Sequence, residues 1–69
     1  MAKFSERLKE LRIEEGLSQK QLALAIGTTD DCIFFWEKER SEPSIADIIL
    51  LAKYFSVPTD YLLGVVDTY

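Results

Sequence analysis

One side of the segment from residue 30 to 38 carries side chains that can bind another molecule. At about 100° per residue of a helix, Ile33 and Trp36 point toward the interior. The side chains on the opposite side are acidic, aromatic or basic: Asp31, Phe34, Phe35 and Lys38, with Asp30 at the border. A carboxylate can accept a hydrogen bond from the N4 amino group of cytosine, and a phenylalanine ring can contact the methyl group of thymine. Adjacent exposed aromatic rings can also form a contact patch for a protein. The residue types therefore allow contact with base edges or with a protein.

Two short helices, 19–26 and 30–38, are predicted to position this surface. Apolar residues recur at helical spacing in both segments, on either side of Gly27. Ser18 precedes Gln21 by three residues, which allows a capping box at the start of the first helix. Thr29 can cap the second. Two helices that meet at a glycine-containing turn have the helix-turn-helix layout, although a plain helical hairpin would show the same pattern.

The whole chain is predicted to fold as a compact five-helix bundle of the all-α class. The expected helices cover residues 4–15, 19–26, 30–38, 45–55 and 60–63. Ser44 and Thr59 are expected to cap the fourth and fifth helices. A chain of 69 residues makes one domain. This domain is expected to span residues 1–69, with its core at about 4–64 and a C-terminal tail at 65–69.

The spacing of apolar residues assigns faces to the first and fourth helices. The residues of the first helix that are expected to face water are Glu6, Arg7, Lys9, Glu10 and Glu14. The residues of the fourth that are expected to face the core are Ile45, Ile48, Leu51, Ala52 and Phe55. The C-terminal third carries more apolar surface than one face needs, and a self-association surface could include Ile49, Leu50, Tyr54, Tyr61, Val65, Val66 and Tyr69. An ordinary core with a frayed tail is the alternative.

The composition excludes several classes of function. The chain contains one cysteine, Cys32, and no histidine, which excludes an internal disulfide, a Cys–His nucleophile pair and the usual zinc sites. We therefore expect no enzyme activity, no cofactor and no metal. No apolar stretch is longer than that of residues 48–52, which is far shorter than the roughly 20 residues of a membrane span. No signal peptide is recognisable. A cytoplasmic protein with no membrane partner is expected.

Three sequence segments resemble a known family: LSQKQLALAIGTT, WEKERSEPS and LLAKYFSVPTDYLLG. They are similar to segments of the lambdoid phage repressor and Cro (Xre-type) helix-turn-helix DNA-binding family. The resemblance covers about residues 4–64. It implies a five-helix bundle in which the second helix of the motif enters the major groove of DNA. It also implies a sequence-specific transcriptional regulator, a repressor that binds a double-stranded operator as a homodimer.

The resemblance also assigns roles to individual residues. It places Gln19, Lys38 and Arg40 in contact with the DNA backbone, and the neighbouring basic residue Lys20 is expected to contact phosphates as well. Contact at the groove edge and with bases is expected from Thr29, Asp30, Asp31, Phe34 and Phe35. Arg12 and Glu37 match a structural ion pair that ties the first helix to the third.

The charge balance opposes this function. The chain carries a net charge of −4, whereas proteins that bind phosphates usually show a basic surface. The charged residues of the presumed DNA face are Lys20, Lys38 and Arg40 against Asp30, Asp31, Glu39 and Glu42. This excess of one negative charge predicts weak counterion release and low non-specific affinity. The alternative function is a helix-turn-helix scaffold, antitoxin-like or anti-repressor, that binds a protein through its third helix.

Two residues in or next to the third helix carry separate predictions. Glu39 stands where the family usually has glycine, so it must extend the helix or adopt a left-handed conformation at a cost of roughly 1 kcal/mol. A slightly longer helix is the favoured interpretation. Cys32 is interpreted as a small packing side chain. Asp30 and Asp31 are expected to raise the pKa of its thiol.

Overall fold

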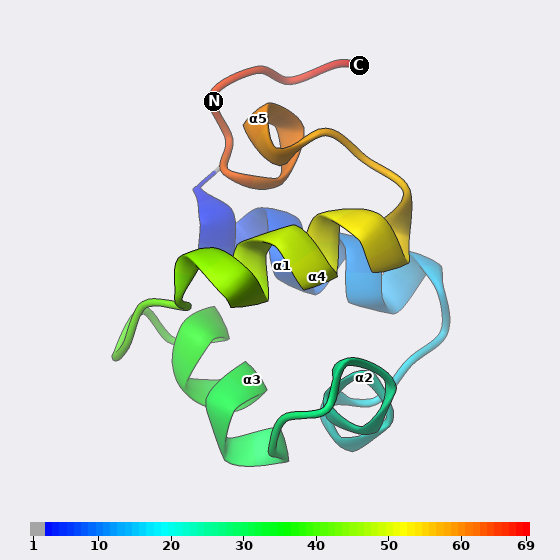
Figure 1. Ribbon diagram of the computed structural model, residues 1–69, viewed down its shortest axis with the longest axis vertical. Helices are drawn as coiled ribbons and strands as arrows, with labels where there is room; N and C mark the ends of the chain where they lie inside the picture. Colours follow the sequence, from blue (N-terminus) through cyan, green and yellow to red (C-terminus); the bar gives the residue numbers. More distant parts are fainter. Residues whose placement is uncertain (1–2) are drawn as a thin grey trace.

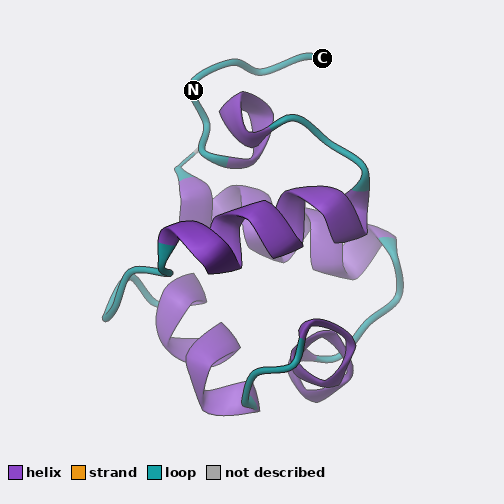
Figure 2. Ribbon diagram, viewed as in Figure 1, coloured by secondary structure: helices purple, strands orange, loops and turns teal. Residues whose placement is uncertain are grey.

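The computed structural model describes residues 3–69, and all regular secondary structure in this range is helical (Figures 1 and 2). The helices are α1 (Phe4–Glu14), α2 (Gln19–Ile26), α3 (Asp30–Glu37), α4 (Ile45–Phe55) and α5 (Thr59–Leu62). The predicted five-helix all-α fold is confirmed, with every helix end within one residue of its expected position. The first two residues of the expected domain lie outside the described range. No helix in the described range is both long and apolar enough to cross a bilayer.

Side-chain caps start the helices at three of the four predicted positions. Ser18 Oγ accepts a hydrogen bond from the Gln21 amide at 3.0 Å, and the Gln21 side chain returns one to the Ser18 amide at 2.8 Å. Ser44 forms the equivalent box with Asp47. Thr29 Oγ1 accepts from the Cys32 amide. The predicted Thr59 cap is wrong, because α5 begins at Thr59 itself, after Pro58, and has no side-chain cap.

The core lies between helices that are stacked along the long axis of the molecule. In Figure 1, α1 and α4 cross the middle, α2 and α3 occupy one end, and α5 with the C-terminal segment occupies the other. The buried apolar side chains are Leu8, Leu11, Leu22, Ala23, Ile33, Trp36, Leu51, Ala52, Val57 and Leu62. Since α3 contributes only its Ile33 and Trp36 side to this core, its opposite side is left for contact with another molecule.

The predicted core face of α4 is correct except at its first residue. Leu51 and Ala52 are buried, and Ile48 and Phe55 pack against the core. Ile45, in contrast, is 81% exposed. Ile45 is the first residue of α4, and the core does not extend to this end of the helix. Helical spacing predicts which side of a helix is apolar, but it does not show where the neighbouring helices end.

The prediction that Arg7 faces water is wrong. Arg7 is 5% exposed, and its guanidinium carbon lies 3.9 Å from the centroid of the Tyr61 ring. Arg7 Nη2 also donates to Asp67 Oδ1 at 3.2 Å. The C-terminal tail is therefore attached to α1 and α5, and Tyr69 packs edge-on against Tyr61 with ring centroids 4.6 Å apart.

Removing the carboxylate of Asp67 should destabilise the fold through Arg7. We expect Asp67→Ala to lower the free energy of unfolding by about 0.5–1 kcal/mol, the upper range for an exposed ion pair, because the side chain of Asp67 is 61% exposed. Urea unfolding followed by circular dichroism measures this change. Glu14→Ala, which removes an exposed carboxylate from the end of α1, is the control. Equal stability of the two variants would show that the tail is not anchored by Arg7.

Candidate nucleic-acid interface

The connection between α2 and α3 is a short turn with a defined backbone. Gly27 adopts the left-handed conformation, with φ 78° and ψ 33°. The Thr28 amide donates to the Ala23 carbonyl at 2.9 Å. A Cβ atom at Gly27 would meet nothing within 4 Å, so glycine is required there by its backbone conformation and not by lack of space. The turn and the Thr29 cap together set the direction of α3 relative to α2.

A hydrogen-bond network centred on Glu37 joins α3 to α1 and α2. Arg12 Nε lies 2.7 Å from Glu37 Oε2, and Arg12 Nη2 lies 3.0 Å from Glu37 Oε1. Arg12 Nη1 also donates to the Leu17 carbonyl at 2.8 Å. The predicted ion pair is thus present, in the bidentate form. Gln19 Nε2 donates to Glu37 Oε1 at 3.2 Å, so this network also orients the side chain that begins α2.

The outward side of α3 presents the predicted acidic and aromatic side chains at the molecular surface. Asp31 is exposed, Phe35 is 39% exposed and Phe34 is half-buried. The two phenylalanine rings pack edge to face with centroids 5.7 Å apart, and Lys38 Nζ lies 5.8 Å from the Phe34 centroid. Neither ring belongs to the monomer core, so both remain available to a bound molecule.

The remaining polar residues expected at the interface lie on the surface near this face. Thr29, Asp30, Lys20 and Arg40 are all exposed. Lys3, which the sequence analysis did not include, forms a salt bridge with Glu39 at 3.4 Å. Its charge offsets that of Glu39 and brings the charge of the presumed DNA face close to neutral. No local sequence pattern connects Lys3 with Glu39, because only the packing of α1 against α3 brings them together.

The prediction of a longer third helix is wrong. The helix ends at Glu37, and Glu39 takes the left-handed conformation with φ 60°. The Glu39 amide donates to the Trp36 carbonyl at 3.3 Å, and the Arg40 amide donates to the Phe35 carbonyl at 2.9 Å. These two bonds form a Schellman motif, which satisfies the last carbonyl groups of α3 and stabilises the left-handed residue despite its side chain.

Substituting Glu39 by glycine should stabilise the protein. Glycine adopts this conformation without steric cost, so we expect Glu39→Gly to raise the free energy of unfolding by about 0.5–1 kcal/mol, less the small contribution of the exposed pair with Lys3. The midpoint of urea unfolding measures the change. Glu42→Gly lies in the same connection but not at a position of positive φ, and it should give no gain. A loss of stability in Glu39→Gly would contradict the strain argument.

Cys32 differs from its expected behaviour. Its half-buried side chain packs against the core, as predicted. The pKa of its thiol, however, is lowered, first by a hydrogen bond with the Thr28 side chain and then by one with Thr29, whose Oγ1 lies 3.3 Å from Sγ. These bonds stabilise the thiolate and outweigh the opposing effects of burial and of Asp47. The expected rise in pKa caused by Asp30 and Asp31 is therefore wrong.

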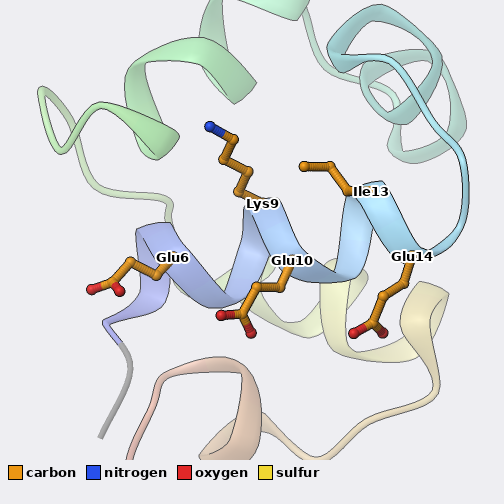
Figure 3. A pocket seen from close by; sticks show the side chains of 5 residues that line it. All are labelled: Glu6, Lys9, Glu10, Ile13 and Glu14. Carbon is orange, nitrogen blue, oxygen red and sulfur yellow. The ribbon is translucent and has the colours of Figure 1, made fainter.

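The outer surface of α1 differs in charge from the α3 face. A hollow of about 460 Å³ on this helix is lined by Glu6, Lys9, Glu10, Ile13 and Glu14. Figure 3 shows these five side chains along α1. In that view the three glutamates point away from the end of the molecule that carries α2 and α3. Three carboxylates at four-residue spacing against one lysine give this surface a net negative charge, which repels a polyanion. Among residues 3–69, no group of His, Cys, Asp and Glu side chains has the arrangement of a metal site.

The residues expected to mediate self-association lie on three parts of the chain: α4, α5 and the C-terminal segment. Ile49, Leu50 and Tyr54 are between 43% and 46% exposed on α4. Val65, Val66 and Tyr69 are exposed on the C-terminal segment. Tyr61 is half-buried between Arg7 and Tyr69, so its ring is already engaged within the monomer.

Known proteins share this sequence pattern and this geometry. A helix-turn-helix family model (HTH_3) matches residues 8–62. The uncharacterized HTH-type transcriptional regulator YobD of Bacillus subtilis is 33% identical over 64 residues, which are 93% of this chain and 57% of YobD. The cryptic phage CTXphi transcriptional repressor RstR of Vibrio cholerae is 31% identical over 61 residues, which are 88% of this chain and 55% of RstR. The matched region is thus little more than half of either relative.

Solved structures agree with this assignment. The P22 c2 repressor in complex with a synthetic operator matches with a TM-score of 0.85 and 27% identity, over 91% of this chain and 96% of that one. The restriction-modification controller protein C.AhdI of Aeromonas hydrophila matches with a TM-score of 0.78 and 32% identity, over 86% of this chain and 89% of that one. The chain therefore belongs to the Xre-type helix-turn-helix family, and the resemblance inferred from its sequence is confirmed.

Proposed function

We propose that the protein is a sequence-specific DNA-binding transcriptional regulator that represses by occupying an operator. The observation that carries this proposal is the outward side of α3, which is free of the monomer core in a fold that matches the operator-bound P22 c2 repressor. A helix presented in this way fits the major groove, where its N-terminal residues reach base edges. Two relatives are a transcriptional regulator and a transcriptional repressor. This similarity favours the DNA-binding function over the protein-binding alternative and over an enzymatic function.

Within this proposal the interface residues divide into two groups by chemistry. Contact with phosphates comes from the polar and basic side chains on either side of α3: Gln19, Lys20, Lys38 and Arg40. Contact with the groove edge and the bases comes from Thr29, Asp30, Asp31, Phe34 and Phe35. Glu37 supports the first group, because it holds Gln19 at the start of α2.

The proposed operator complex contains a homodimer. Two half-sites need two α3 helices at a fixed separation, and a two-fold symmetric dimer supplies this spacing. The proposed contact surface consists of exposed apolar side chains of α4 and the C-terminal segment, together with the half-buried Tyr61 of α5 beside them: Ile49, Leu50, Tyr54, Tyr61, Val65, Val66 and Tyr69. Analytical ultracentrifugation of the protein alone determines whether it is a dimer in solution. The same measurement with a selected duplex determines how many subunits bind one duplex.

Selection from a random duplex library tests the proposed function. Repeated rounds should enrich one short motif, arranged as two half-sites if the dimer forms. Its affinity should fall with salt, with a slope of log K against log salt of about −3 per subunit, as expected for three phosphate-contacting cations. Failure to enrich any duplex would overturn the proposal and favour a protein partner at α3.

A further inference from the structure

The base chemistry of the proposed operator follows from the side chains that α3 presents. We infer that α3 selects base edges on which a pyrimidine 5-methyl group lies beside an amino group, and that 5-methylation of cytosine at its contact position strengthens binding. This inference rests on the proposed DNA-binding function and specifies the ligand of that same surface. The methyl groups concerned are those of thymine and 5-methylcytosine.

The first support is the position of Asp31 relative to Phe35. They are separated by four residues on an eight-residue helix, so they are neighbours on one face, with Cβ atoms about 5–6 Å apart. Both side chains are exposed. Within residues 3–69, no hydrogen bond or salt bridge involves the carboxylate of Asp31. This face thus pairs a free hydrogen-bond acceptor with an apolar ring.

The second support is the orientation of the aromatic pair. Phe34 packs edge to face against Phe35 and has Lys38 beside its ring. Phe34 therefore packs against the more exposed Phe35 and holds its ring in place at the surface. Contact between this phenyl ring and a methyl group removes apolar surface from water, which favours binding. The ring cannot form the hydrogen bonds by which polar base edges are recognised.

The third support is the lack of a hydrogen-bond donor on this face between Asp31 and Phe35, because the ammonium group of Lys38 lies at the C-terminal end of α3, beside Phe34. Guanine presents two acceptors in the major groove, N7 and O6, and is read by Arg or Lys. The outward side chains of α3 between Asp31 and Phe35 have no donor, since an ionised carboxylate only accepts. Guanine is therefore disfavoured opposite Asp31, whereas the N4 amino group of cytosine and the N6 amino group of adenine are favoured.

These preferences converge on one base edge. In 5-methylcytosine the N4 amino group and the 5-methyl group are adjacent on the same ring, so Asp31 and Phe35 can contact them together. Thymine keeps the methyl group but has the O4 acceptor in place of the amino group. Cytosine keeps the amino group and lacks the methyl group. At this position we expect higher affinity for 5-methylcytosine than for cytosine, and higher affinity for thymine than for uracil.

Single-base substitution in the selected duplex tests this inference. Each thymine is replaced by uracil, which removes only the methyl group, and each cytosine by 5-methylcytosine, which only adds one. At one or two positions per half-site, uracil should weaken binding, or 5-methylcytosine should strengthen it, by about fourfold, the effect of burying one methyl group. Other positions in the same duplex serve as internal controls.

Two substitutions assign the effect to α3. Phe35→Ala should abolish the discrimination between thymine and uracil, and between 5-methylcytosine and cytosine. The control Leu24→Ala removes an apolar side chain that is 72% exposed on α2. This variant should still discriminate thymine from uracil and 5-methylcytosine from cytosine. Asp31→Asn adds a donor and should shift the preferred base to adenine. A selected duplex that is insensitive to every methyl change would overturn this inference and leave the proposed function intact. Failure to select any duplex would overturn both.

Discussion

Replacing Glu37 by alanine is expected to cost about 3–5 kcal/mol of folding free energy, the range for breaking a buried ion pair. The Arg12 side chain is 12% exposed and that of Glu37 is 4% exposed, so the variant leaves a buried guanidinium with only the Leu17 carbonyl as partner. Small domains are stable by about 5–15 kcal/mol, and this chain is at the small end. Urea unfolding at neutral pH should show a large shift of the midpoint.

A double variant separates the ion pair from the packing around it. Arg12→Met with Glu37→Met removes both charges and keeps much of the apolar volume, so it should be far more stable than Glu37→Ala. It would also release Gln19 from Glu37, so DNA affinity should fall even where folding is restored. Glu14→Ala, at an exposed carboxylate of α1, is the single-site control. A Glu37→Ala variant as stable as this control would show that the pair does not hold α1 and α3 together.

Removing two cations beside α3 is expected to weaken DNA binding by on the order of 50-fold per subunit at 0.1 M salt. Lys38 and Arg40 are exposed at the C-terminal end of α3, and each released phosphate contact counts for roughly eightfold under these conditions. The double variant Lys38→Ala with Arg40→Ala should bind every duplex more weakly by the same factor, because phosphate contacts carry no sequence information. Fluorescence anisotropy against the selected duplex and an unrelated duplex measures both affinities.

The salt dependence provides an independent test of the same prediction. The slope of log K against log salt should become shallower by about two, one for each lost contact. Lys53→Ala removes one positive charge from the last turn of α4. It is the control for the single variant Lys38→Ala, which should make the slope shallower by about one. A loss of affinity confined to the selected duplex would contradict the phosphate role and place these side chains among those that select the sequence.

The local structure was predictable because it depends on neighbours in the sequence. Ser18 with Gln21 and Ser44 with Asp47 are three residues apart, and a capping box needs no more than that. Gly27 ends α2 through its own backbone conformation. The outward direction of Phe35 follows from the helical period once Ile33 and Trp36 are known to be apolar. The family resemblance supplied the partners of the Arg12–Glu37 pair, which spacing alone could not identify.

Residues whose surroundings come from distant parts of the chain were not predictable in this way. Arg7 is buried because Tyr61 and Asp67 cover it, more than fifty residues later in the sequence. Lys3 offsets the charge of Glu39 only because α1 lies beside the end of α3.

What the sequence by itself determined is the set of helices, three of their N-terminal caps and the side of α3 that stays outside the core, since these depend on spacings of three or four residues. The tertiary structure alone decided how charges are distributed: the burial of Arg7, the partner of Lys3 and the separation of the acidic face of α1 from the α3 surface. The physical reason is the distance along the chain over which each kind of interaction acts. Caps and helical periodicity act over a few bonds, whereas burial and electrostatic pairing depend on distances in space that exist only after the helices have packed.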